Sequence, residues 1–428
     1  MLKRWPVLLY VLAAALLAVA LVRQFDDGEP APKRQARATI TPTASPTPSA
    51  QAALPRIPAA GPGLAVGITE FNPNLYAADT PAPEPWEQVR QAIGALQPEF
   101  FRLVIPWNLL QPAAEQPADL DKPETGCMRE VGPCLGWVGV RQQLQALATR
   151  QRDGGWQTLV VLTGTPDWAA APPSGCERKK TTPRARAPRP DALPAYRQLI
   201  LDVLKVADEE GASLHFWSPW NEPNLPPFVS PQRAECDADS PSLAPAVYTE
   251  LARTLIGALD EAPGEQQMVI GETAGLLKNT KLVTSVGQFI AGLPQDIVCA
   301  SPVYSQHAYI GGDDPVEQAA TALAAHGCPE PHTIWITETG VGPAPEEYSA
   351  VADPAAAGCR DLHDRLVQWF NDPRVTVAFQ YTVREDDKFP VGLFSTDMTE
   401  TRPALEEWQA WGGGRPSTAP PPASACGT

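Results

Sequence analysis

The sequence is short of positive charge. Its 428 residues include 33 lysines and arginines against 49 aspartates and glutamates, which gives a net charge of −16. The basic residues form only one short patch, at residues 178–189, so the chain lacks the electrostatic footprint of a nucleic-acid-binding protein. We expect no nucleic-acid partner, and the acidity indicates a well-solvated surface rather than a site for a cationic ligand.

Metal-binding motifs are also missing. The eight cysteines show none of the paired CxxC spacings of zinc sites, and the five histidines are scattered along the chain. His215 lies at the start of a predicted strand and His363 lies on a predicted helix, so both fit structural roles. We therefore expect no metal and no cofactor.

Long apolar runs are scarce, and the clearest one covers residues 5–22, directly after Lys3 and Arg4. This run can be a signal-peptide core or a marginal membrane span, so residues 1–25 are either a cleaved signal or an inserted anchor. Both alternatives predict export, with the protein secreted or tethered to the outer face of the cytoplasmic membrane.

An exported chain with an even number of cysteines is expected to form disulfide bonds. Closeness in sequence suggests the pairs Cys127–Cys134 and Cys299–Cys328. Cys176–Cys236 and Cys359–Cys426 remain as looser pairings, because connectivity does not follow from spacing.

One folded unit is predicted, over residues 62–412. Residues 26–61 and 413–428 are rich in Pro, Ala, Thr and Ser and lack the apolar periodicity of a packed core, so we assign them to a linker and a tail. Between them, short apolar runs alternate eight times with stretches of helical periodicity. The eight predicted strands cover residues 64–71, 100–107, 157–164, 214–220, 268–272, 297–309, 333–339 and 375–382. Eight βα units in about 350 residues favour an α/β fold, the (β/α)8 TIM barrel, over an open doubly wound sheet.

Two glutamates lie at the carboxyl ends of predicted strands, where such a barrel carries its active site. The fourth predicted strand ends in WNEPN, with Asn221 and Glu222, and the seventh ends in TETG, with Glu338. Side chains alternate along a strand, so Glu338 shares a face with Ile334 and Ile336. If this face points toward the barrel axis, Glu338 lies in the mouth.

Two carboxylates in one mouth suit the cleavage of a glycosidic bond. One donates a proton to the leaving oxygen, and the other attacks or stabilises the anomeric carbon. Their surroundings must separate their pKa values so that one stays protonated while the other stays charged. Arg102, near the end of the second predicted strand, is a candidate cation for keeping Glu338 ionised.

Each of these residues has a plainer interpretation when it is taken singly. Asn-Glu-Pro makes a good turn after a strand, because Pro223 fixes φ and Asn221 can cap. Glu338 alone could be a buried acid in an ion pair. Taken together, two carboxylates at strand ends, with Arg102 and Tyr309 also at strand ends, favour catalysis.

The WNEPN and TETG motifs resemble those of glycoside hydrolase clan A, the retaining (β/α)8 glycosidases, and the likeness spans nearly the whole folded unit. Segments 163–169 and 392–408 are similar to members around families five and thirty-nine. The resemblance implies that Glu222 is the acid/base, that Glu338 is the nucleophile, and that Asn221 hydrogen-bonds the sugar 2-hydroxyl.

Further positions follow from the same resemblance. His307 and Tyr309 lie where the clan has an aromatic hydroxyl that contacts the nucleophile, and Arg102 lies where it has a second-strand arginine. Many members carry a tryptophan at the end of strand eight as the floor of the −1 subsite, whereas this chain reads AFQYTVRED there. Tyr381 is the candidate substitute.

Four more residues lie near the same mouth. Trp107 and Trp168 can stack on sugar rings, and core packing is the equally weighted alternative. Glu70 and Glu272 end the first and fifth predicted strands, and we expect each to form a salt bridge with an arginine or lysine.

The sequence therefore predicts a monomeric, exported, retaining glycosidase. It would cleave β-glycosidic bonds in an extracellular polysaccharide or oligosaccharide through Glu222 and Glu338. The alternative from another class is a non-catalytic glycan-binding barrel that acts as a cell-surface adhesin, which has no need for both carboxylates. Transglycosylation, with a sugar acceptor in place of water, uses the same residues and stays open.

Overall fold

The computed structural model describes residues 55–59, 63–77, 82, 84–122, 139–341, 350–385, 390–412 and 419–426. The predicted signal or anchor segment, most of the linker and the predicted Cys127–Cys134 bond lie outside these residues. Within them, no helix is both long and apolar enough to cross a membrane.

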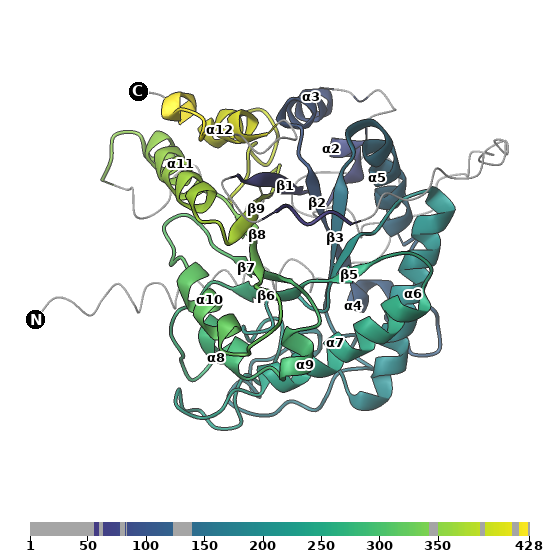
Figure 1. Ribbon diagram of the computed structural model, residues 1–428. Coiled ribbons are helices and arrows are strands. Elements are labelled where there is room, and N and C mark those ends of the chain that lie inside the picture. Colours follow the sequence, from purple (N-terminus) through teal and green to yellow (C-terminus); the bar gives the residue numbers. More distant parts are fainter. Residues whose placement is uncertain are drawn as a thin grey trace, which may run out of the picture.

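Parallel strands surrounded by helices form a barrel, as predicted (Figure 1). The strands are β1 (Ala65–Thr69), β2 (Phe100–Pro106), β3 (Gln157–Thr163), β4 (Phe216–Ser218), β5 (Gln267–Met268), β6 (Ile270–Ala274), β7 (Val303–His307), β8 (Thr333–Thr339) and β9 (Val375–Tyr381). Their order in the sheet is β5-β4-β3-β2-β1-β9-β8-β7-β6. The short β5 pairs with β4 and β6 pairs with β7, with only Val269 between them, so β5 and β6 are two parts of the fifth strand of a (β/α)8 barrel.

Helices cover the outside of the sheet. They are α2 (Pro73–Tyr76), α3 (Trp86–Leu96), α4 (Trp107–Leu110), α5 (Val140–Gly154), α6 (Leu193–Glu210), α7 (Ala244–Glu261), α8 (Val286–Ala291), α9 (Gln295–Val298), α10 (Val316–Ala324), α11 (Pro354–Asn371) and α12 (Pro403–Trp411). Helices α5 and α6 end at Gly155 and Gly211, whose φ angles of 68° and 74° are in the left-handed region that glycine adopts without cost.

One predicted strand is too long. The sixth was expected over 297–309, but β7 begins at Val303, and residues 297–298 belong to helix α9. The apolar run IVCASPV is too short to separate a buried helical turn from a strand by its pattern, which explains the error.

The core has two layers. Inside the barrel, Trp335 packs against Phe216 and Phe379, with ring centroids 4.8 and 6.5 Å away, and Phe100 packs against all three. A second, larger layer fills the space between the sheet and the helices. Gly67 on β1 makes room for the inner layer, because a Cβ there would lie 2.3 Å from the ring of Phe379.

Strand β8 shows which of its faces points toward the barrel axis. Ile334 and Ile336 pack in the outer layer, and Trp335 between them points into the barrel. The condition that the isoleucine face points toward the axis is therefore not met. Glu338 still reaches the mouth, because the register of β8 against β9 shifts between Ile336 and Thr339.

Three disulfide bonds join the predicted pairs Cys176–Cys236, Cys299–Cys328 and Cys359–Cys426. The first connects the loops that follow β3 and β4, on the mouth side of the barrel. The third attaches the short 3-10 helix Ala423–Cys426 to α11, in the helical layer.

Candidate active site

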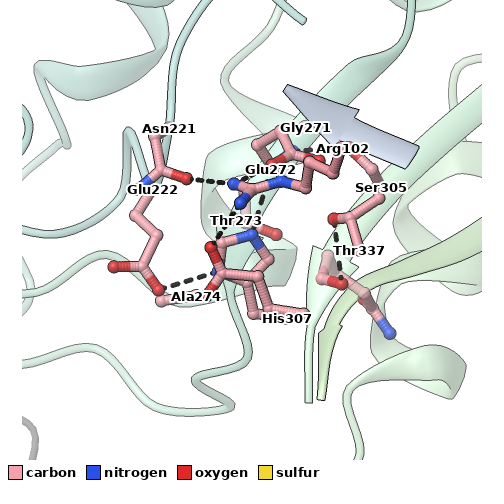
Figure 2. Close-up of polar contacts among 12 residues, drawn as sticks. Arg102, Asn221, Glu222, Gly271, Glu272, Thr273, Ala274, Ser305, His307 and Thr337 are labelled. Atoms are coloured by element: carbon pink, nitrogen blue, oxygen red, sulfur yellow. Dashed lines mark hydrogen bonds and ion pairs between the residues drawn. The ribbon is translucent and has the colours of Figure 1, made fainter. Parts of the chain in front are cut away.

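The barrel brings Arg102, Glu222, Glu272, His307 and Glu338 together at the carboxyl ends of the strands. Figure 2 shows Arg102, Glu222, Glu272 and His307 of this cluster. They come from β2, the loop after β4, β6, β7 and β8. Four of these residues, Arg102, Glu222, His307 and Glu338, were predicted at one site from the sequence. Glu272 was expected only to form a salt bridge, which it does, but it lies at the centre of the cluster.

Arg102 is the central cation. Its Nη1 lies 2.9 Å from Glu338 Oε1, while its Nη2 donates to Glu272 Oε2 at 2.7 Å and to Asn221 Oδ1 at 2.6 Å. Burial by itself would lower the pKa of Arg102, but the charges of Glu272 and Glu338 raise it, so the guanidinium is permanently charged.

Glu338 is held at both of its oxygens. Arg102 contacts Oε1, and the Tyr309 hydroxyl donates to Oε2 at 2.6 Å. Burial raises the pKa of Glu338, and the positive charges of His307 and Arg102 oppose that rise. The side chain is 10% exposed, so one edge of the carboxylate is open to the mouth.

The WNEPN segment fixes Glu222 opposite Glu338. The Trp220 indole donates to the Phe228 carbonyl at 2.8 Å. The Asn224 side chain donates to the Ala274 carbonyl and accepts from the Ala274 N–H. These bonds anchor the segment on both sides of Glu222, which adopts a φ of 39° in the left-handed region.

Glu222 lies close to the other carboxylate. Its Oε1 is 2.9 Å from His307 Nδ1, and its side chain is 13% exposed. An oxygen of Glu222, an oxygen of Glu338 and a ring nitrogen of His307 lie within 4.8 Å of one another.

His307 lies beneath this pair. Its Nδ1 is also 3.3 Å from Glu338 Oε2, and its Nε2 is 3.3 Å from Glu272 Oε2. Burial by itself would lower the pKa of His307, but the charges of Glu338, Glu222 and Glu272 raise it to about 10. With a carboxylate oxygen at each ring nitrogen, the contacts also suit a protonated imidazole. Glu222, His307 and Glu338 lie close enough together to hold a metal ion, which would have to displace any proton on the imidazole nitrogen that it binds.

The predicted aromatic residues differ in position. Tyr381 ends β9 and packs edge-on against Tyr309, with ring centroids 6.4 Å apart, so it lies beside the residue that contacts Glu338. Trp107 is fully buried, and its indole donates to Gln111 Oε1, so core packing describes it. Trp168 packs on Trp107 and is half-buried, and its contact with a sugar stays a prediction.

Comparisons with known proteins support the fold. No protein-family model matches the chain, and no curated protein matches its sequence. A GH30 endoxylanase from Clostridium papyrosolvens is similar in structure, with a TM-score of 0.50, 13% identity and coverage of 85% of this chain and 74% of the other. Xylanase C of family GH30 from Talaromyces cellulolyticus has a TM-score of 0.50 and 12% identity, and the match covers 83% of this chain and 76% of the other. SrfJ from Salmonella typhimurium has a TM-score of 0.53 and 9% identity, and the match covers 82% of this chain and 74% of the other. At the level of the fold, these structures confirm the expected resemblance to clan A.

Proposed function

We propose that this protein is a retaining glycoside hydrolase that cleaves β-glycosidic bonds in a polysaccharide or oligosaccharide outside the cell. The observation that carries the proposal is the approach of Glu222 and Glu338 at the barrel mouth, with oxygens within 4.8 Å of each other. Retaining glycosidases hold their two carboxyl groups about 5–5.5 Å apart, whereas inverting enzymes separate them by about 6.5–9.5 Å to admit a water molecule. The short separation favours a covalent intermediate.

The proposed reaction is a double displacement. The Glu338 carboxylate attacks the anomeric carbon, while Glu222 donates its proton to the leaving oxygen and the glycosidic bond breaks. Glu222, now a carboxylate, takes a proton from water, and the oxygen of that water displaces Glu338 from the sugar. Two inversions restore the original anomeric configuration.

The neighbouring groups suit these roles. Arg102 and Tyr309 place a donor on each oxygen of Glu338, which stabilises its ionised form and fixes its direction of attack. Arg102 can only donate, so the Asn221 oxygen must face it. The Asn221 amide nitrogen is then left to donate to a sugar hydroxyl.

Export is part of the proposal. The three disulfide bonds are typical of a protein that folds in an oxidising compartment, where an extracellular glycan would be its substrate.

The test is a screen of the purified protein against aryl β-glycosides and polysaccharides, alongside its Glu338→Ala and Glu222→Ala variants. We expect Glu338→Ala to abolish turnover of every substrate. Glu222→Ala should still react with aryl glycosides that have good leaving groups, then stall until azide replaces the base-activated water. Glycan binding without any turnover by the unmodified protein would instead support the non-catalytic barrel.

A further inference from the structure

The site contains a third carboxylate that the double displacement does not use. The Glu272 side chain has no exposed surface, and its Oε2 lies 2.7 Å from Arg102 Nη2, 3.0 Å from Arg102 Nε and 3.3 Å from His307 Nε2. Because a guanidinium can only donate, this geometry fits an ionised carboxylate. Burial by itself would raise the pKa of Glu272, but Arg102 and His307 lower it to about 2.

His307 connects Glu272 to the catalytic pair. One ring nitrogen faces Glu272, and the other faces both Glu222 and Glu338 (Figure 2 shows Glu222, Glu272 and His307). An imidazolium satisfies this arrangement, because both nitrogens then donate to a carboxylate. A neutral imidazole with its proton on Nε2 would instead have to accept the proton of Glu222 at Nδ1, and that bare nitrogen would also face Glu338 Oε2.

The charges of the cluster balance in one particular state. Glu272 contributes one negative charge, and Arg102 and His307 contribute two positive charges. Neutrality then requires Glu222 and Glu338 to carry one negative charge, which means one proton between them. The proposed mechanism starts from this state, and uncompensated buried charge is costly.

The backbone around Glu272 adopts an irregular conformation that places its side chain between Arg102 and His307. The register of β6 against β7 shifts between Gly271 and Thr273, and Glu272 has a φ of 54°. Its N–H donates to Ser305 Oγ at 2.8 Å, and its carbonyl accepts from the Glu222 N–H at 2.8 Å. A left-handed conformation in a residue other than glycine costs about 1–3 kcal/mol and persists where the surroundings enforce it.

We infer that Glu272 is a positioning residue for the catalytic pair, whose buried negative charge orients Arg102 and holds His307 as a cation that faces both Glu222 and Glu338. The inference rests on the proposed function for its catalytic consequence, but the state of His307 can be measured without any turnover.

Two phenols also contact the residues on either side of Glu272. Tyr248 on α7 accepts a hydrogen bond from the Gly271 N–H, and Tyr304 on β7 shares one with Thr273. Burial raises the pKa of both tyrosines, so they stay neutral at physiological pH. The pH response of the cluster therefore belongs to His307 and the three carboxyl groups.

The experiment compares Glu272→Gln with Glu407→Gln in the full chain. Glu407 is a matched control, since it is also fully buried and lies 2.8 Å from a histidine, His363, but it belongs to α12 in the outer layer. Nitrogen NMR of the imidazole rings, with the His307 signals assigned from His307→Gln, should show His307 doubly protonated through pH 8 in the unmodified protein. In Glu272→Gln its pKa should fall by about one unit or more, because an adjacent negative charge is lost. Glu407→Gln should leave it unchanged.

Kinetics on a substrate from the screen give a second result. We expect kcat/KM at the original optimum to fall about tenfold or more, as for other residues that orient reacting groups. Glu272→Asp, which keeps the charge, should recover part of this loss.

Two results would overturn the inference. One is a His307 that is neutral at pH 7 in the unmodified protein, which decides the matter even if Glu272→Gln does not fold. The other is a Glu272→Gln protein whose His307 titration matches that of Glu407→Gln. An absence of glycosidase activity would refute the proposed function and leave the imidazole measurement interpretable.

Discussion

At the residue scale, the two oxygens of Glu338 have different partners. Oε1 faces the buried charge of Arg102, and Oε2 accepts from the hydroxyl of Tyr309. Arg102 is shared with Glu272 and Asn221, so its removal would disturb the whole cluster. Tyr309→Phe is a smaller change, because it removes only the hydroxyl that donates to Glu338 Oε2.

We predict that Tyr309→Phe lowers kcat by about 10- to 100-fold, since a hydrogen bond to a charged group contributes about 1.5–3 kcal/mol. The lost donor stabilised the carboxylate, so the pKa of Glu338 should rise. Glu338 must be ionised to attack, and the acidic limb of kcat/KM should therefore move to higher pH. Steady-state kinetics across pH measure both effects.

Tyr76→Phe is the control for this change. Tyr76 is fully buried in the outer layer, and its hydroxyl makes no hydrogen bond within the described part of the chain. Tyr76→Phe should leave the pH profile of kcat/KM unchanged. A folded Tyr309→Phe protein with unchanged kinetics would remove Tyr309 from the site.

At the scale of single elements, β8 shows what a sequence pattern can and cannot predict. Its bounds, 333–339, are those expected from the sequence. Alternation placed Glu338 on the face of Ile334 and Ile336, yet those side chains point outward and Glu338 points into the mouth. The register shift responsible is set by pairing with β9, which is far away in sequence.

The fifth strand shows the same limit. Its polar ending, GET, was visible in the sequence, and a salt bridge was expected for Glu272. Its position between Arg102 and His307 depends on the irregular pairing of β6 with β7, which no local pattern reveals. Motifs could therefore predict that Glu222 and Glu338 lie at the barrel mouth, whereas the place of Glu272 beneath them required the three-dimensional structure.

The inner layer of the barrel gives a prediction about β1. Gly67→Ala should destabilise the protein by about 1–3 kcal/mol, because the added methyl group meets the ring of Phe379, which is enclosed by Phe100 and Trp335. Denaturant unfolding measures the change. Gly94→Ala in α3 is the control, since nothing lies within 4 Å of its Cβ, and there alanine should stabilise by about 0.4–1 kcal/mol. Equal effects of the two changes would contradict the tight packing at Gly67.

At the scale of the whole molecule, disulfide bonds connect segments that are far apart in sequence. The Cys359–Cys426 bond joins residues 67 positions apart, and the Cys176–Cys236 bond joins residues 60 apart. Both restrict the unfolded chain, and the loss of either should destabilise the protein by about 2–5 kcal/mol.

Thiol titration tests the complete set of bonds. Three bonds account for six of the eight cysteines, while Cys127 and Cys134 lie outside the described residues. We predict no reactive thiol in the oxidised protein under denaturing, non-reducing conditions. Two thiols per chain would contradict the fourth bond and leave the other three in place.

The central claim is that Glu222 and Glu338 carry out a double displacement, and the anomeric configuration of the first-formed product tests it most directly. Proton NMR, started on addition of the protein to a substrate found in the screen, resolves the anomers before mutarotation mixes them. The short distance between the two carboxylates predicts a product that retains the β configuration of the substrate. An α product at the earliest time points would show that water attacks directly, and would contradict the assignment of Glu338 as the nucleophile.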